Sequence, residues 1–124
     1  MGEDGEATEG SLLAFAAREF ALNERLDDGS TQRDHAQSHF RQTGKYNPGT
    51  EPVECPYELA YLWGYWTSMN MRRTSSGFGP NPISEEAMAA WARRRGIVFE
   101  PFESDALDAL EALCMRSAAK VKKK

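Results

Sequence analysis

The sequence predicts a single, small, all-α domain of about five helices. Its 124 residues are 40% hydrophobic and include three Trp, four Tyr and six Phe, enough to build one core. Apolar residues recur at helical spacings between capping residues, and the apolar/polar alternation of a strand never persists. We expect the ordered domain to cover residues 11–119, between a flexible acidic leader (1–10) and a basic tail (120–124).

The first helix is predicted from its N-terminal cap and its hydrophobic stripe. Ser11 is placed as the N-cap, and the run Asp27-Asp28-Gly29 ends the helix. The apolar residues recur at intervals of three, seven and four: Leu12, Phe15, Leu22 and Leu26. This spacing places one apolar stripe along the helix.

A second helix is expected from the cap Thr31 to about Thr43, where Gly44 stops it. Its apolar face is thin, because only Ala36 and Phe40 are strongly apolar. We therefore expect this helix to pack at the edge of the domain. The proline- and glycine-containing residues 44–55 are expected to form a loop.

The third helix is expected to organise the fold. Pro56 suits its first turn, and the helix should run from Tyr57 to about Arg73. Its apolar side chains point in every direction: Leu59, Tyr61, Leu62, Trp63, Tyr65, Trp66, Met69 and Met71. A helix that is apolar all round is buried centrally or covered in part by a partner. The run is too short and too rich in Tyr to span a membrane.

Two more helices are predicted after an irregular turn at residues 74–83. Ser84 is a good N-cap for the fourth, which ends with three arginines (93–95) and a stop at Gly96. Pro101 opens the fifth. Their apolar residues are Met88 and Trp91 on the fourth helix, and Leu107, Leu110 and Cys114 on the fifth.

The charge distribution argues against a nucleic-acid-binding body. The net charge is −4, but residues 116–124 carry five bases and no acid, so residues 1–115 carry −4 − 5 = −9. The two helices around Gly96 could suggest a helix-turn-helix, yet the second opens with acids where a recognition helix needs donors and cations. A small helical DNA-binding or regulatory adaptor protein is therefore the alternative, after a protein that binds another protein. The terminal lysines are interpreted as a solubilising tail.

No catalytic or metal-binding constellation is predicted. His35 and His39 are four residues apart, which would let both face one metal, but no Glu lies at position 36 and no third ligand follows at a meaningful spacing. The chain has no Gly-x-Ser-x-Gly elbow, and Gly77-Phe78-Gly79 is interpreted as a turn rather than a phosphate loop. We predict a protein that is not an enzyme and holds no metal or cofactor.

The two cysteines, Cys55 and Cys114, are expected to be free thiols in a reducing cytosol. Cys114 lies on the apolar face of the last predicted helix, where a buried, inert thiol is expected. A disulfide between the two remains an alternative. No N-terminal signal peptide is predicted, so we expect a cytoplasmic protein.

The aromatic residues are the most informative feature. They exceed what one small core usually absorbs, and Trp, Tyr and Arg are the residues that anchor protein interfaces. We therefore predict that at least one Trp is part-exposed at a face that binds another protein. The predicted partner-binding residues are Trp63, Trp66, Arg72, Phe78, Trp91 and Phe102.

The segment from Pro56 to about Ala118 resembles a family of small tail-assembly proteins of long-tailed phages, encoded between the major tail protein and the tape measure protein. The pattern comprises an aromatic pair (Trp63 and Trp66), an arginine (Arg72 or Arg73), a Gly/Pro-rich turn (Gly77 to Ser84), a further Trp (Trp91), an aromatic–acid pair (Phe102-Glu103) and a Leu–acid pair (Leu110-Glu111). The upstream Gln42-Thr43-Gly44 also fits. Three positions differ conservatively from the pattern: Trp66 stands in place of Phe, Phe102 in place of Trp, and Glu111 in place of Asp.

The resemblance implies a tail assembly chaperone, or the downstream half of one made by ribosomal frameshifting. Such a protein would keep the tape measure protein soluble in the host cytoplasm while tail protein polymerises around it. The implied partners are the tape measure protein and the major tail protein, with no cofactor, membrane or specific nucleic acid. Whether copies of the chain associate with one another is left open.

Overall fold

We describe the fold from a computed structural model, which describes residues 8–122. The predicted all-α class is confirmed, with five helices in one small domain. They are α1 (Glu9–Leu22), α2 (Gln32–Thr43), α3 (Ala60–Asn70), α4 (Glu85–Arg94) and α5 (Pro101–Lys122), and a 3-10 turn, η1 (Tyr57–Leu59), leads into α3. The predictions for the first seven residues and for the last two of the basic tail lie outside the described residues.

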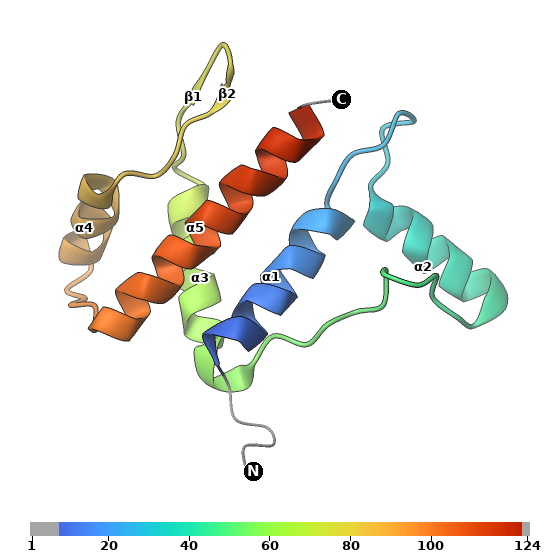
Figure 1. Ribbon diagram of the computed structural model, residues 1–124, viewed down its shortest axis with the longest axis horizontal. Coiled ribbons are helices and arrows are strands. Elements are labelled where there is room, and N and C mark those ends of the chain that lie inside the picture. Colours follow the sequence, from blue (N-terminus) through green and yellow to red (C-terminus); the bar gives the residue numbers. More distant parts are fainter. Residues whose placement is uncertain (1–7, 123–124) are drawn as a thin grey trace.

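The core forms where α1 and α3 pack against α5, and α4 also contributes buried residues to it (Figure 1). The longest, α5, packs against both α1 and α3, while α4 lies near the start of α5 at one side of the molecule. The central cluster of buried residues is Leu12 and Ala16 of α1, Leu62, Trp66 and Met69 of α3, Met88, Trp91 and Ala92 of α4, and Ala106, Leu107 and Leu110 of α5. The third helix thus lies in the core, as expected, although α5 is the element that joins α1 to α3.

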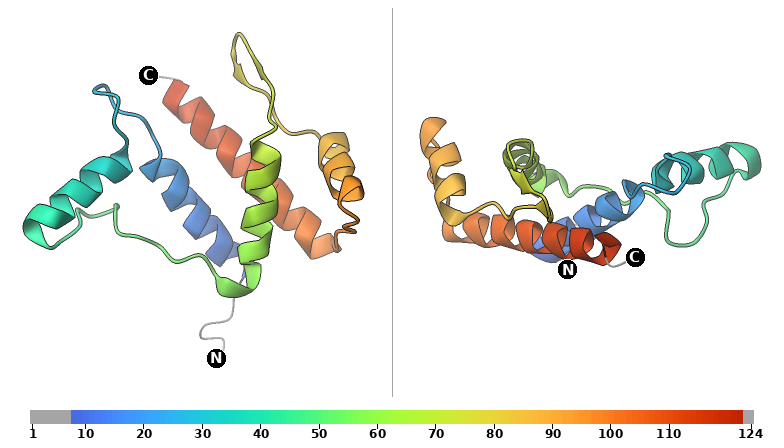
Figure 2. Two further views of the ribbon diagram at one scale, coloured as in Figure 1. Left: turned by 180° about the vertical axis from the view of Figure 1, so that it is seen from behind. Right: turned by 90° about the horizontal axis from the view of Figure 1, so that it is seen from above.

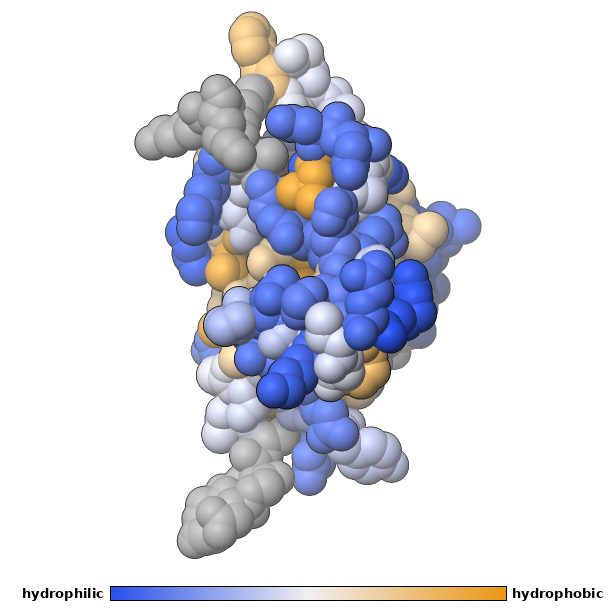
Figure 3. All heavy atoms as spheres, turned by 90° about the vertical axis from the view of Figure 1, so that its right-hand side faces the viewer, coloured by the Kyte–Doolittle hydropathy of each residue, from blue (hydrophilic) through white to orange (hydrophobic). Residues whose placement is uncertain are grey.

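The prediction that α2 packs at the edge is confirmed. Figure 2 shows α2 on the opposite side of the molecule from α4, joined to η1 by a long loop. Ala36 is its only buried residue, and Phe40, 42% exposed, stacks on Tyr46 at a ring separation of 4.5 Å. The surface on this side of the molecule is mainly hydrophilic, with scattered hydrophobic residues (Figure 3).

The predicted bounds of the first helix were wrong at both ends. Thr8, rather than Ser11, is the N-cap, and its Oγ1 accepts a hydrogen bond from the Ser11 amide. The helix ends at Leu22 because the next residues turn back, forming an isolated bridge between Arg25 and Thr31. Leu26 therefore belongs to this turn and not to the helical stripe.

The third helix is shorter than predicted, and a hairpin follows it. Strands β1 (Ser75–Ser76) and β2 (Gly79–Pro80) pair antiparallel around Gly77-Phe78, although no strand was expected. Two residues per strand are too few to show a period in the sequence. Gly79 has a φ of 126°, a conformation that side chains other than glycine rarely adopt.

No helix within residues 8–122 has both the length and the hydropathy needed to cross a membrane.

Candidate protein-binding site

A buried ion pair fixes the base of the hairpin to α5. Arg73, just after α3, donates from Nη1 to Oε2 of Glu111 at 2.7 Å and from Nη2 to Oε1 at 2.6 Å. The two side chains are only 8% and 9% exposed. This two-point geometry holds both groups in one orientation, because the guanidinium fork matches the carboxylate.

Further hydrogen bonds connect the pair to α3 and to the segment that follows the hairpin. Glu111 also accepts from Trp66 Nε1 at 3.2 Å and from the Ile83 amide at 2.9 Å. Arg73 also donates to the backbone oxygen of Asn81 at 2.9 Å. The pair therefore joins α3, both sides of the hairpin and α5 into one network, and the burial of the two charges is offset by their partners.

The network keeps both groups charged. Burial alone raises the pKa of Glu111, but hydrogen bonds from Arg73, Ile83 and Trp66 outweigh it, so the pKa lies below its ordinary value. The hydrogen bond to Glu111 raises the pKa of Arg73 above its ordinary value, against the effect of burial. A carboxylate held ionised by three donors is suited to structure rather than to proton transfer.

The three tryptophans lie in or against the core. Trp66 is 2% exposed and Trp91 is 8% exposed, with its Nε1 donating to Ser68 Oγ at 3.1 Å. Trp63 is half-buried and packs edge-on against Phe15 at a ring separation of 5.1 Å. Trp63 is therefore the part-exposed tryptophan, and its place at a binding face stays a prediction.

The other three predicted site residues are exposed. Phe78, at the tip of the hairpin, is 87% exposed, and Phe102, at the start of α5, is 55% exposed. Arg72 is also exposed, at the end of α3. The six predicted residues thus do not form one surface. Trp66 is buried in the core, and Phe102 lies at the opposite end of α3 from the hairpin.

Glu103, the residue after Phe102, is held by two hydrogen bonds at the start of α5. Glu103 Oε1 accepts from the Glu100 amide at 2.7 Å, capping α5, and Oε2 accepts from the Tyr61 hydroxyl at 2.6 Å. Burial and the Glu103 carboxylate raise the pKa of Tyr61 to about 12, so this hydroxyl stays protonated and keeps donating. The aromatic–acid pair therefore anchors the start of α5 to α3.

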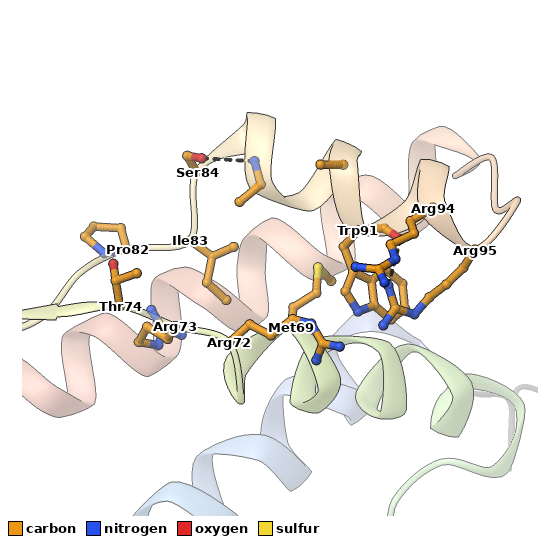
Figure 4. Close-up of a pocket in the computed structure, with 12 residues that line it drawn as sticks. Met69, Arg72, Arg73, Thr74, Pro82, Ile83, Ser84, Trp91, Arg94 and Arg95 are labelled. Atoms are coloured by element: carbon orange, nitrogen blue, oxygen red, sulfur yellow. Dashed lines mark hydrogen bonds between the residues drawn. The ribbon is translucent and has the colours of Figure 1, made fainter.

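A groove lies between the end of α3, the segment after the hairpin and α4 (Figure 4). Its volume is about 490 Å³, and Met69, Ile83 and Trp91 contribute to its apolar floor. Four arginines line it: Arg72, Arg73, Arg94 and Arg95. The Arg95 guanidinium lies 4.3 Å from the centre of the Trp91 ring, a cation–π contact.

The described residues show no metal-binding constellation. No group of three or more His, Cys, Asp or Glu between residues 8 and 122 is placed to hold a metal. His35 instead contacts Asp28, with Nε2 and Oδ2 3.2 Å apart. Both cysteines are free thiols, and burial raises the pKa of each, which lowers thiolate reactivity.

Sequence reasoning missed the buried role of Arg73 and Glu111. A signal was present, because Leu107, Leu110, Glu111 and Cys114 follow the i, i+3, i+4, i+7 pattern of one helix face. An acid at such a position indicates a buried partner. The partner could not be chosen from the sequence, since Arg72 and Arg73 are adjacent and only the fold turns Arg73 inward.

These features define a small helical protein whose charged network holds an exposed aromatic hairpin and a cationic groove in place, an arrangement suited to binding another protein. A family model described as phage tail assembly chaperone matches residues 40–114, more than half of the 124-residue chain. The chain therefore belongs to the phage tail assembly chaperone family, which is non-catalytic. Neither the search of curated proteins nor that of solved structures gave a match.

Proposed function

We propose that the chain binds the tape measure protein, alone or together with the tail tube protein, in the host cytoplasm during tail assembly. Family membership supports a tail protein as the partner. The family resemblance implies that a tape measure protein is long and helical. Its exposed apolar stripes must be shielded from solvent until tail protein surrounds it. A rigid partner that offers exposed aromatic and Met side chains can supply this cover.

The observation that carries the proposal is the exposed Phe78. Phe78 is 87% exposed at the tip of the hairpin, and Met71 at the end of α3 is also 85% exposed, so two large apolar side chains at this end of α3 are left uncovered. The hairpin is anchored through Arg73 and Asn81 to the buried ion pair. A partner therefore meets a pre-ordered aromatic group, which lowers the entropy cost of binding.

We assign different tasks to the six predicted residues. Phe78, Arg72 and Phe102 would contact the client directly, and Trp91 would do so through its edge in the groove. Trp66 would act from beneath by holding Glu111, and Trp63 would hold α1 on α3.

The test is binding of the purified tape measure protein by Phe78→Ala and by a control, Phe40→Ala. Phe40 is an exposed aromatic (42%) on the edge helix α2, which lies on the opposite side of the molecule from α4. We expect Phe78→Ala to weaken binding by about 2 kcal/mol or more, with its melting temperature unchanged, and Phe40→Ala to bind like the original protein. Equal binding by all three proteins would show that the hairpin is not the binding surface.

A further inference from the structure

The groove beside the hairpin has a charge opposite to that of the protein as a whole. The body (residues 1–115) carries −9, whereas the described lining of the groove contains four arginines and neither Asp nor Glu. Arg73 is neutralised by Glu111, which leaves Arg72, Arg94 and Arg95 to set its charge. None of the ion pairs among residues 8–122 involves these three arginines.

The arginines stand on both walls of an apolar floor. Arg72 projects from the end of α3, while Arg94 and Arg95 gather around Trp91 on α4 (Figure 4). Arg95 is held in place, because its Nη1 donates to the Trp91 backbone oxygen at 3.1 Å and its guanidinium contacts the Trp91 ring. Between the walls, the floor offers aliphatic and thioether surface from Met69 and Ile83.

We propose that this groove binds a segment of the tape measure protein in which an apolar side chain is flanked by carboxylates. The inference rests on the proposed function and names the chemistry of the client. The apolar side chain would occupy the floor, and the carboxylates would pair with Arg72 on one wall and with Arg94 and Arg95 on the other. A groove of about 490 Å³ is large enough for the side chains of a short peptide segment.

Two other occupants fit less well. The phosphates of a nucleic acid would be repelled by a body that carries a net charge of −9. Phosphates would also make no favourable contact with the apolar floor of the groove. A second copy of the chain does offer acids, since Glu85, Glu86 and Asp108 line a groove on α4 and α5. That acidic surface is itself concave, however, so the two grooves cannot fill one another.

The test compares two charge-reversed variants in binding to the purified tape measure protein. Arg72→Glu/Arg94→Glu reverses one arginine on each wall, and Arg93→Glu is the control, because Arg93 is exposed in the same turn of α4 but outside the groove. Both variants place an acid near the C-terminus of α4, so they share the cost of opposing the helix dipole. Thermal melts show that each is folded, and Arg72→Gln/Arg94→Gln replaces the double variant if it melts early.

We expect the double variant to bind at least tenfold more weakly and Arg93→Glu to bind like the original protein. Among overlapping peptides of the tape measure protein, the strongest binder should carry carboxylates around an apolar residue. Replacing these carboxylates with Lys should restore binding to the double variant. Added salt should weaken binding of the original protein more than that of the double variant.

Each contrary result has a distinct meaning. No complex with the original protein would overturn the proposed function and this inference together. A complex that the double variant forms equally well, or a strongest peptide that is basic, would overturn the inference alone. The inference alone would also be overturned if the double substitution left binding to the tape measure protein unchanged and abolished only oligonucleotide binding, or only self-association measured by sedimentation.

Discussion

Arg73 and Glu111, 38 residues apart in the chain, form a two-point ion pair that lies almost entirely out of solvent. The pair joins the end of α3 to the middle of α5, and through the Ile83 amide and the Asn81 oxygen it also holds the segment that follows the hairpin. The positions of Phe78 and of the cationic groove therefore depend on two charges in the interior. This dependence yields separate predictions for folding and for binding.

Removing one partner of the pair is expected to destabilise the protein strongly. In Arg73→Gln, Glu111 is left as a buried charge without its counter-ion, which should lower the free energy of unfolding by about 3–5 kcal/mol. The matched control is Arg72→Gln, one residue away and exposed, which should change it by less than about 0.5 kcal/mol. Urea denaturation measures both values. Similar small losses for the two variants would show that the pair contributes little to folding.

The same carboxylate should make stability depend on pH. The pKa of Glu111 is lowered in the folded protein, so below the ordinary glutamate value of about 4.3 the unfolded chain binds the proton first. Its stabilising contribution is complete above that value and is lost as the pH falls through the folded pKa. The free energy of unfolding should therefore fall more steeply on acidification in the original protein than in Glu111→Gln. Other carboxylates with lowered pKa values, such as Asp28, are present in both proteins and cancel; parallel curves would contradict the assignment.

Two of the three residues that differ from the pattern expected from the resemblance contact each other. The resemblance leads us to expect Phe at Trp66 and Asp at Glu111, and Trp66 Nε1 donates to Glu111 Oε1 at 3.2 Å. We expect Trp66→Phe and Glu111→Asp each to destabilise, and the double variant to lose less than the sum of the two. The interaction free energy should lie in the range of about 0.5–3 kcal/mol seen for contacting residues. Strict additivity in denaturation curves would indicate that the two departures are independent.

The helices were predictable where local chemistry decides them. Thr31 and Ser84 cap α2 and α4 as expected, and Gly44 ends α2 with a φ of 77°. The edge position of α2 also followed from its thin apolar face. The end of α1 could not be foreseen, because Leu26 keeps the helical spacing and only the bridge between Arg25 and Thr31 removes it from the helix.

The candidate site was only partly predictable. Exposure of Phe78 followed from its place between two glycines in a turn. The groove could not be predicted in this way, because it forms only where the end of α3 packs near α4. The spacing of residues in the sequence does not show which helices lie next to one another. Arg94 lies in the last turn of α4, where a cation interacts favourably with the helix dipole. Its position across the groove from Arg72 depends on tertiary structure, which the sequence pattern does not show.

The most direct test of the chaperone function is the solubility of the tape measure protein when it is expressed with and without this chain. We predict that the tape measure protein aggregates when expressed alone and that, with the chain present, it elutes from size-exclusion chromatography as a soluble complex of fixed stoichiometry. Co-expression with Arg73→Gln, which disturbs the base of the hairpin, should give less soluble complex. A tape measure protein that is equally insoluble with and without the chain, while the chain itself remains folded, would contradict the proposed function.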